Sequence, residues 1–175
     1  MHHLILGGIR SGKTALAERL AATVSAQVTY VATAQAGDKE MAARIERHRR
    51  QRPSRWGLVE QPLALASVLR SAKRQAEECL LIDCMSLWLS NLLHAGDQVL
   101  EREMAAFLDA IPNCPSRLVI VSNEVGLGTI AMDPLTRRFC DQLGWLNQAL
   151  ALCCQNVTMS VAGLPLVLKE PAHVQ

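Results

Sequence analysis

Aromatic residues, net charge and long apolar segments are all scarce in this chain of 175 residues. Aromatics make up only 3% of a chain that is half apolar, so we expect a core built mostly from Leu, Val, Ile and Ala. The formal net charge of +2 gives no whole-protein electrostatic case for binding nucleic acid or an anionic membrane. The apolar runs are too short or too interrupted to span a bilayer, and no signal sequence opens the chain. We therefore expect a cytoplasmic protein without a membrane span.

Metal-binding cysteine patterns and interdomain linkers are also missing. The six cysteines form no Cys-x-x-Cys pair and no metal-ligand spacing with histidine, so we interpret them as reduced thiols. No repeat, low-complexity tract or linker rich in Ser, Gly or Pro divides the chain. We expect residues 1–175 to form a single domain.

Short apolar runs alternate with longer helical patterns. The apolar runs predict buried strands at 3–6, 27–32, 79–84, 117–122 and 156–162, with a candidate edge strand at 165–169. The helical patterns lie at 12–24, 38–51, 62–76, 99–110 and 133–154. This alternation predicts an α/β three-layer sandwich with a mostly parallel sheet. Ligands of such sheets bind beyond the carboxyl ends of the strands.

A phosphate-binding loop follows the first predicted strand. The pattern G-x-x-x-x-G-K-[ST] is matched at every fixed position by Gly7, Gly8, Ile9, Arg10, Ser11, Gly12, Lys13 and Thr14. Glycines let successive N–H groups point at phosphate oxygens, and the following helix adds positive potential. We expect Lys13 to reach the terminal phosphates and the Thr14 hydroxyl to bind Mg²⁺. Asp83 ends the strand predicted at 79–84, where its carboxylate can complete the magnesium site.

A basic cluster follows the second predicted strand, with six arginines in the twelve positions from Arg44 to Arg55. Within it, Arg44, His48 and Arg52 are spaced four apart and share one helix face. Neighbouring positive charge disfavours imidazolium, so a neutral His48 is available for attack on a nucleotide phosphorus. An exposed histidine on a solvated basic helix explains the same spacing, and the residues alone do not decide between the two.

Two later segments have less specific patterns. Glu124 follows the strand predicted at 117–122 and precedes two glycines, which indicates either a site loop, with Glu124 as metal ligand, hydroxyl-orienting group or base, or a tight turn. Trp145 lies in the last predicted helix and is interpreted as a core or subunit contact.

Taken together, several segments resemble the bifunctional adenosylcobinamide kinase/adenosylcobinamide-phosphate guanylyltransferase family. They are GGIRSGKT, YVATAQ, DKEMAARIERHRRQRP, LLIDC, VSNEVGLG and GWLNQALA, and they cover nearly the whole chain in order. The chain departs from the family pattern at Thr129–Ala131, where Ile-Val-Pro is usual, and at Cys140, where the family has arginine. It also has Arg47 where some members have a second histidine. The phosphate-binding loop and His48 are unaffected.

The resemblance implies two reactions of cobalamin biosynthesis in a RecA-like P-loop fold. The first phosphorylates adenosylcobinamide with ATP or GTP. The second transfers GMP from GTP through a GMP-histidine intermediate, on His48 here, giving adenosylcobinamide-GDP and pyrophosphate. Mg²⁺ and a homo-oligomer, commonly a trimer, are also implied. The implied guanine-nucleotide site comprises Ala32, Thr33, Ala34, Arg49, Arg50, Gln51, Arg52, Glu60 and Asp83.

Two alternatives to this assignment remain. A P-loop kinase without guanylyl transfer would use Lys13 and Asp83 but not His48. A nucleotide-binding regulatory module would use the arginine cluster to contact a partner. Turnover with a small-molecule acceptor distinguishes an enzyme from such a module.

Overall fold

The computed structural model describes residues 1–35, 37, 39, 43, 46, 50, 52–72 and 78–171. In this part of the chain one sheet has the strand order β3-β2-β4-β5-β1-β6-β7. Its strands are β1 (His2–Gly7), β2 (Gln27–Ala32), β3 (Gly57–Glu60), β4 (Glu78–Asp83), β5 (Arg117–Asn123), β6 (Asn156–Val161) and β7 (Leu164–Lys169). All neighbouring strands are parallel except β6 and β7, which are antiparallel. The mostly parallel sheet is therefore confirmed, with β7 as the expected edge strand.

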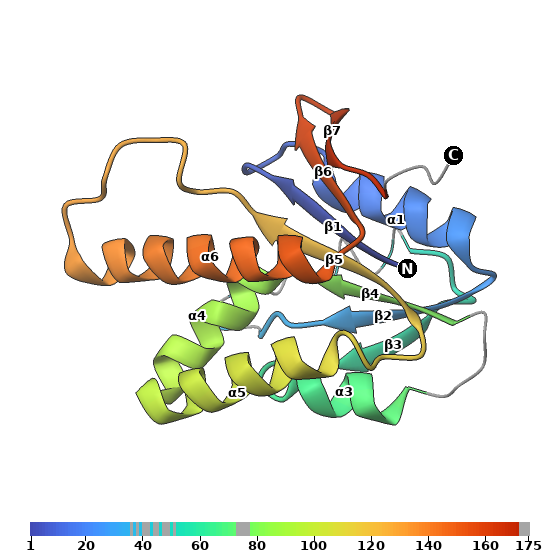
Figure 1. Cartoon of the computed structure of the whole chain (residues 1–175), viewed down its shortest axis with the longest axis horizontal. Helices are drawn as coiled ribbons and strands as arrows, with labels where there is room; N and C mark the ends of the chain where they lie inside the picture. Colours follow the sequence, from blue (N-terminus) through green and yellow to red (C-terminus); the bar gives the residue numbers. More distant parts are fainter. Residues whose placement is uncertain are drawn as a thin grey trace.

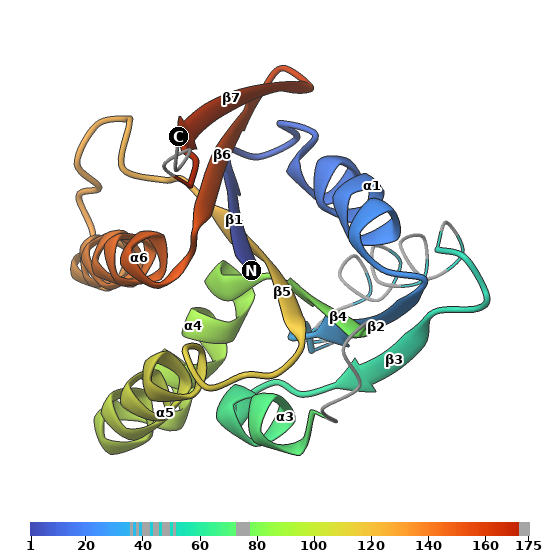
Figure 2. The same cartoon turned by 45° about the vertical axis from the view of Figure 1, so that its right-hand side comes forward.

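The helices cover both faces of the sheet (Figures 1 and 2). One face carries α1 (Lys13–Val24), and the other carries α3 (Leu65–Ser71), α4 (Met85–Ala95), α5 (Asp97–Ala110) and α6 (Pro134–Cys153). Side chains of β1 alternate between two cores: Leu4 and Leu6 lie in the cluster under α3 to α6, and Ile5 lies in the cluster under α1. This alternation produces the predicted three-layer sandwich.

The larger core is organised around Trp88 on α4, whose side chain is fully buried. Its ring lies 5.0 Å from that of Phe107 on α5, measured between centroids. Its indole Nε1 donates a hydrogen bond of 2.7 Å to the Leu63 carbonyl, which satisfies the one polar atom of the side chain. The Trp88 side chain therefore links α4 to α5 and to the segment before α3.

Two elements were missed from the sequence. β3 is a short edge strand whose side chains are mostly exposed, so it lacks the continuous apolar run of a buried strand. α4 follows β4 almost directly, and its five buried residues include Ser86 as well as Trp88, so the segment has no clear polar face from which to recognise a helix.

The predicted helix at 38–51 is described only in part. The residues Lys39, Ala43, Glu46 and Arg50 are helical, and Arg50 Nε donates to Glu46 Oε1 at 2.8 Å, one helical turn away. The helix predicted at 62–76 is shorter at its start and begins at Leu65. Across the described residues, none of the helices combines the length and apolar character needed to span a membrane.

Candidate nucleotide site

The phosphate-binding loop joins β1 to α1 at the carboxyl ends of the parallel strands. Gly7, the last residue of β1, is in register with Asn123 of β5 and Ser160 of β6. Within the loop, Ser11 N–H and the Lys13 ammonium both donate to the Gly8 carbonyl, at 3.3 and 3.0 Å. The motif therefore forms the expected strand, loop and helix, and Thr14 lies in the first turn of α1.

The end of β6 and the turn that joins it to β7 pack against this loop. The Ser11 carbonyl accepts hydrogen bonds from Ser160 Oγ at 2.7 Å and from Gly163 N–H at 2.9 Å. Gly12 has a φ of +88°, and a Cβ on Gly12 would lie 3.0 Å from Gly163 Cα. The loop conformation thus depends on residues about 150 positions further along the chain, which the sequence analysis did not connect to it.

Lys13, at the start of α1, lies near Asp83, the last residue of β4. Burial lowers the pKa of Lys13 below its ordinary value, while the nearby Cys84 and Asp83 side chains act in the opposite direction. Asp83 accepts a hydrogen bond of 2.8 Å from the Tyr30 hydroxyl. A half-buried ammonium close to a strand-end carboxylate suits the binding of phosphate together with a divalent cation.

Tyr30, which the sequence analysis did not single out, connects this carboxylate to the basic cluster. The guanidinium carbon of Arg52 lies 3.4 Å from the centroid of the Tyr30 ring, a cation–π geometry. Glu18 on α1 belongs to the same group: burial raises its pKa, the Asp83 charge raises it further, and Arg52 lowers it. Arg52 Nε is buried and has no hydrogen-bond partner among the described residues. The position of Tyr30 could have been recognised from the sequence, because it is a polar aromatic residue in the predicted strand just before the Ala32–Ala34 segment.

Other predicted nucleotide-site residues are fixed at the ends of neighbouring strands. Thr33 is fully buried; its Oγ1 donates to the Cys84 carbonyl at 2.8 Å and accepts from Cys84 N–H at 2.9 Å. The Ala32 carbonyl accepts from Gln61 N–H at 2.9 Å, next to the exposed Glu60 at the end of β3. The two hydrogen bonds of the Thr33 hydroxyl to Cys84 therefore join the carboxyl end of β2 to that of β4. Ala34 is half-buried just beyond this point.

Three predicted residues, His48, Arg49 and Gln51, lie outside the described residues. Arg50 is exposed and paired with Glu46, whereas Arg52 reaches Tyr30 beside Asp83. Of the two described arginines in the implied guanine-nucleotide site, Arg52 is thus the one placed against the strand ends.

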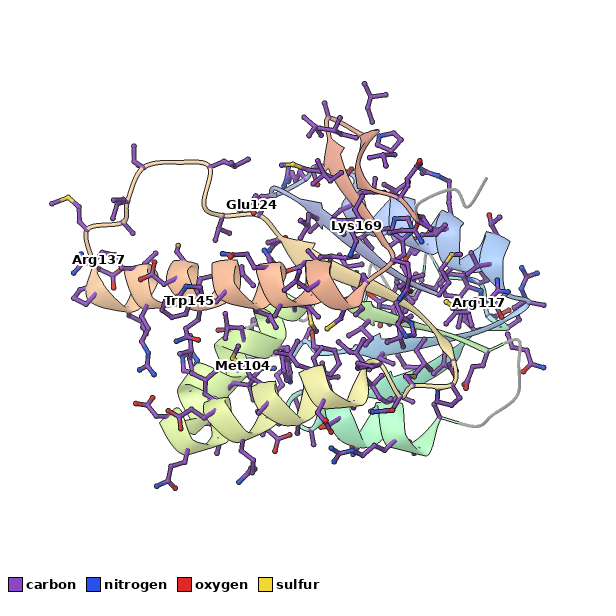
Figure 3. The ribbon with its side chains drawn as sticks, in the orientation of Figure 1. Met104, Arg117, Glu124, Arg137, Trp145 and Lys169 are labelled. Carbon is purple, nitrogen blue, oxygen red and sulfur yellow. The ribbon has the colours of Figure 1, made fainter. Side chains whose placement is uncertain are left out.

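Glu124 closes its own loop. Figure 3 shows it where β5 meets the segment leading to α6. Its Oε1 accepts from Gly126 N–H at 2.6 Å, and its N–H donates to the Gly7 carbonyl at 3.0 Å. The side chain of Glu124 therefore supports the turn beside the phosphate-binding loop, and its suggested chemical roles remain predictions.

The last helix contributes a buried amide. Asn147 accepts from Ser122 Oγ at 2.6 Å and donates to the Asn123 carbonyl at 3.0 Å, which ties α6 to the carboxyl end of β5. Trp145, in contrast, is 60% exposed on α6 (Figure 3). A core role for Trp145 is therefore wrong for this chain, and a subunit contact stays a prediction.

The donors near the loop suit magnesium better than a soft metal. The described residues contain no group of three or more His, Cys, Asp or Glu side chains placed to hold a metal ion. Thr14 and Asp83 supply a hydroxyl and a carboxylate, and Mg²⁺ is typically held by one or two such protein ligands with water and phosphate oxygens. The six cysteines are free thiols, as expected.

A phosphate-binding loop between the first strand and first helix of a mostly parallel, helix-covered sheet defines the class of P-loop NTPase-type α/β proteins. A match to a protein-family model agrees with this class and identifies one family within it. The chain belongs to the cobinamide kinase / cobinamide phosphate guanyltransferase family, whose model matches residues 3–168, and it is accordingly a bifunctional transferase of cobalamin biosynthesis.

Similar proteins support this membership. The bifunctional adenosylcobalamin biosynthesis protein CobP of Pseudomonas aeruginosa is 54% identical over 173 residues, covering 98% of this chain and 99% of the relative. The bifunctional adenosylcobalamin biosynthesis protein CobU of Escherichia coli K12 is 37% identical, covering 95% and 98%. A solved structure from Pyrococcus horikoshii OT3 shares the fold, with a TM-score of 0.53, 9% identity and coverage of 97% of this chain and 86% of that chain.

Proposed function

We propose that residues 1–175 act as one domain that phosphorylates adenosylcobinamide with ATP or GTP and then converts the product to adenosylcobinamide-GDP with GTP. The observation that supports this most strongly is the phosphate-binding loop with Lys13 and Asp83 at the strand ends, in a chain that matches the family over nearly its whole length.

In the kinase step, the acceptor hydroxyl attacks the terminal phosphorus of the triphosphate and loses its proton, and a nucleoside diphosphate leaves. Backbone N–H groups of Gly8 to Lys13 bind the phosphates, and the Lys13 ammonium stabilises charge on the transferred group. Thr14 and Asp83 hold Mg²⁺, which neutralises phosphate charge. The lowered pKa of Lys13 is expected to return toward its ordinary value when phosphate binds, because the anion stabilises the ammonium.

In the transferase step, a His48 nitrogen attacks the α-phosphorus of GTP, forming a P–N bond and releasing pyrophosphate. A phosphate oxygen of adenosylcobinamide phosphate then attacks the same phosphorus, and the P–N bond breaks. Arg52, four residues after His48 in the chain, lies on Tyr30 next to Asp83. This contact supports a location of the transferase site beside the phosphate-binding loop, with Arg49 to Arg52, Glu60 and residues 32–34 around the guanine nucleotide.

A homo-oligomer, with three copies, completes the proposal. All six residues of β7 are exposed, including Leu164 at 71% and Leu166 at 54%. Trp145 on α6 is exposed as well, at 60%. Apolar surface of this extent is typical of an interface, and β7 also presents an open sheet edge.

The first experiment uses α-³²P-GTP and Mg²⁺ without corrinoid, followed by a test for acid-labile, base-stable label on the denatured protein. We expect label on the wild type and on Arg19→Ala, an exposed α1 control, but none on His48→Ala. A wild type that takes no label yet phosphorylates adenosylcobinamide is a plain kinase. A wild type that does neither, and turns over triphosphate only with a protein partner, is a regulatory module.

A further inference from the structure

A pocket with a volume of about 550 Å³ lies between α4, the carboxyl end of β5 and the start of α6. Its apolar lining includes Leu93, Leu135 and Phe139, and its polar groups include Ser90, His94 and Asn123. We call it the α4–α6 pocket. A hollow of this size, mostly apolar with a few polar groups, is typical of a small-molecule site.

The pocket adjoins the phosphate-binding loop through Asn123. Asn123 is the register partner of Gly7, and its Nδ2 donates to Ser86 Oγ at 2.8 Å. Ser86 follows Asp83 by three residues, on the first turn of α4. The pocket wall is thus continuous with the two strand ends that carry the loop and the predicted magnesium ligand.

One buried polar atom of this wall, Asn123 Oδ1, lacks a hydrogen-bond partner among the described residues. A buried amide oxygen without a partner costs free energy unless a donor reaches it. His94 Nδ1 lies 2.7 Å from the Ser90 carbonyl, so Nδ1 must be the protonated nitrogen and Nε2 in the neutral ring is an acceptor. The pocket therefore offers hydrogen-bond acceptors to a ligand that brings N–H or O–H donors.

We propose that the α4–α6 pocket binds the hydroxyl-bearing amide arm of the kinase acceptor, an inference that rests on the proposed function. The amide N–H or hydroxyl of such an arm donates to Asn123 Oδ1, and its hydrocarbon part contacts Leu135 and Phe139. The continuity with Gly7 places an acceptor bound here beside the triphosphate, which occupies the loop.

The acceptor is larger than the pocket, and the surface next to the pocket accounts for the rest. A corrin ring with its amide arms exceeds the drug-sized ligands that such a pocket encloses. The segment before α6 exposes Leu127, Ile130 and Met132, at 79%, 85% and 95%. We assign the macrocycle to this apolar segment, outside the pocket.

The test compares two exposed leucines of α6. Leu135, 59% exposed, lines the pocket, and Leu152, 83% exposed, does not. Leu135→Gln should raise the KM for cobinamide about tenfold, because part of the apolar contact between Leu135 and the bound arm is lost. The KM for ATP and the labelling by α-³²P-GTP without corrinoid should not change. Leu152→Gln should leave all three unchanged.

Binding measured without turnover gives a second readout. Equilibrium dialysis of cobinamide, followed by its visible absorbance, should show weaker binding for Leu135→Gln and for His94→Phe, which keeps a ring but removes the acceptor. An unchanged cobinamide affinity in both variants overturns the inference. A rise confined to the KM for ATP also overturns it, because that result would place the nucleotide base in the pocket. A wild type without kinase activity refutes the proposed function instead, and normal cobinamide binding by that protein would still support the pocket.

Discussion

The phosphate-binding loop is held against the β6–β7 turn so closely that one methyl group at Gly12 should disrupt it. Ala at this position must adopt the left-handed conformation, since φ is +88°, at a cost of about 1–2 kcal/mol. Its Cβ would also lie 3.0 Å from the backbone of Gly163, and overpacking of this kind adds about 1–3 kcal/mol. We expect Gly12→Ala to lower the free energy of unfolding by about 2–5 kcal/mol, the sum of these two costs.

Two other glycines separate these costs. Gly163 has a φ of +81° but no atom within 4 Å of an added Cβ, so Gly163→Ala should cost only the conformational part, about 1–2 kcal/mol. Gly8 has no neighbour within 4 Å of such a Cβ and no positive φ, so Gly8→Ala should stay within about 0.5 kcal/mol of wild type. From the most to the least stable variant, the expected order is therefore Gly8→Ala, Gly163→Ala and Gly12→Ala.

Urea unfolding of the three variants, with and without triphosphate, measures both stability and binding. Ligand at a hundred times its Kd should stabilise the wild type by about 2.7 kcal/mol. Gly12→Ala should lose most of this gain because its loop N–H groups no longer point at the phosphates, whereas Gly163→Ala should retain it. Equal destabilisation by Gly12→Ala and Gly163→Ala would refute the contact with the β6–β7 turn as the cause.

Two further predictions concern Tyr30 and His3. Tyr30→Phe removes the 2.8 Å hydrogen bond to Asp83 but keeps the ring under Arg52, and should lower the free energy of unfolding in urea by about 1 kcal/mol. Tyr30→Leu also removes the ring and should cost about 0.5–2 kcal/mol more. Equal losses in the two variants would contradict a stabilising contact between Arg52 and the Tyr30 ring. Burial lowers the pKa of His3 in the folded protein below 6.5, its ordinary value. As the pH falls, His3 of the unfolded chain therefore binds a proton before His3 of the folded protein does, and the free energy of unfolding declines below pH 6.5. His3→Gln should therefore reduce the loss of unfolding free energy between pH 7.5 and 5.5, and an unchanged loss would rule out His3 as a source.

Much of the fold could be predicted because its signals are local. The β1 and β5 runs are apolar over consecutive residues, and the loop motif from Gly7 to Thr14 is contiguous. Such patterns report burial and turn chemistry within a few positions. β3 and α4 were missed for the same reason: an exposed edge strand and a helix without a clear polar face lack the local period that identifies strands and helices.

The amino-acid sequence by itself determined the parallel α/β architecture, the phosphate-binding loop and, through its matching segments, the family. The tertiary structure decided which distant groups complete the site. Ser160 and Gly163 support Ser11 across about 150 positions, and Tyr30 joins Asp83 to Arg52. Contacts of this kind arise only when the strand order brings separate segments to one sheet edge, and no spacing within a segment encodes them, because they depend on sheet register and side-chain packing.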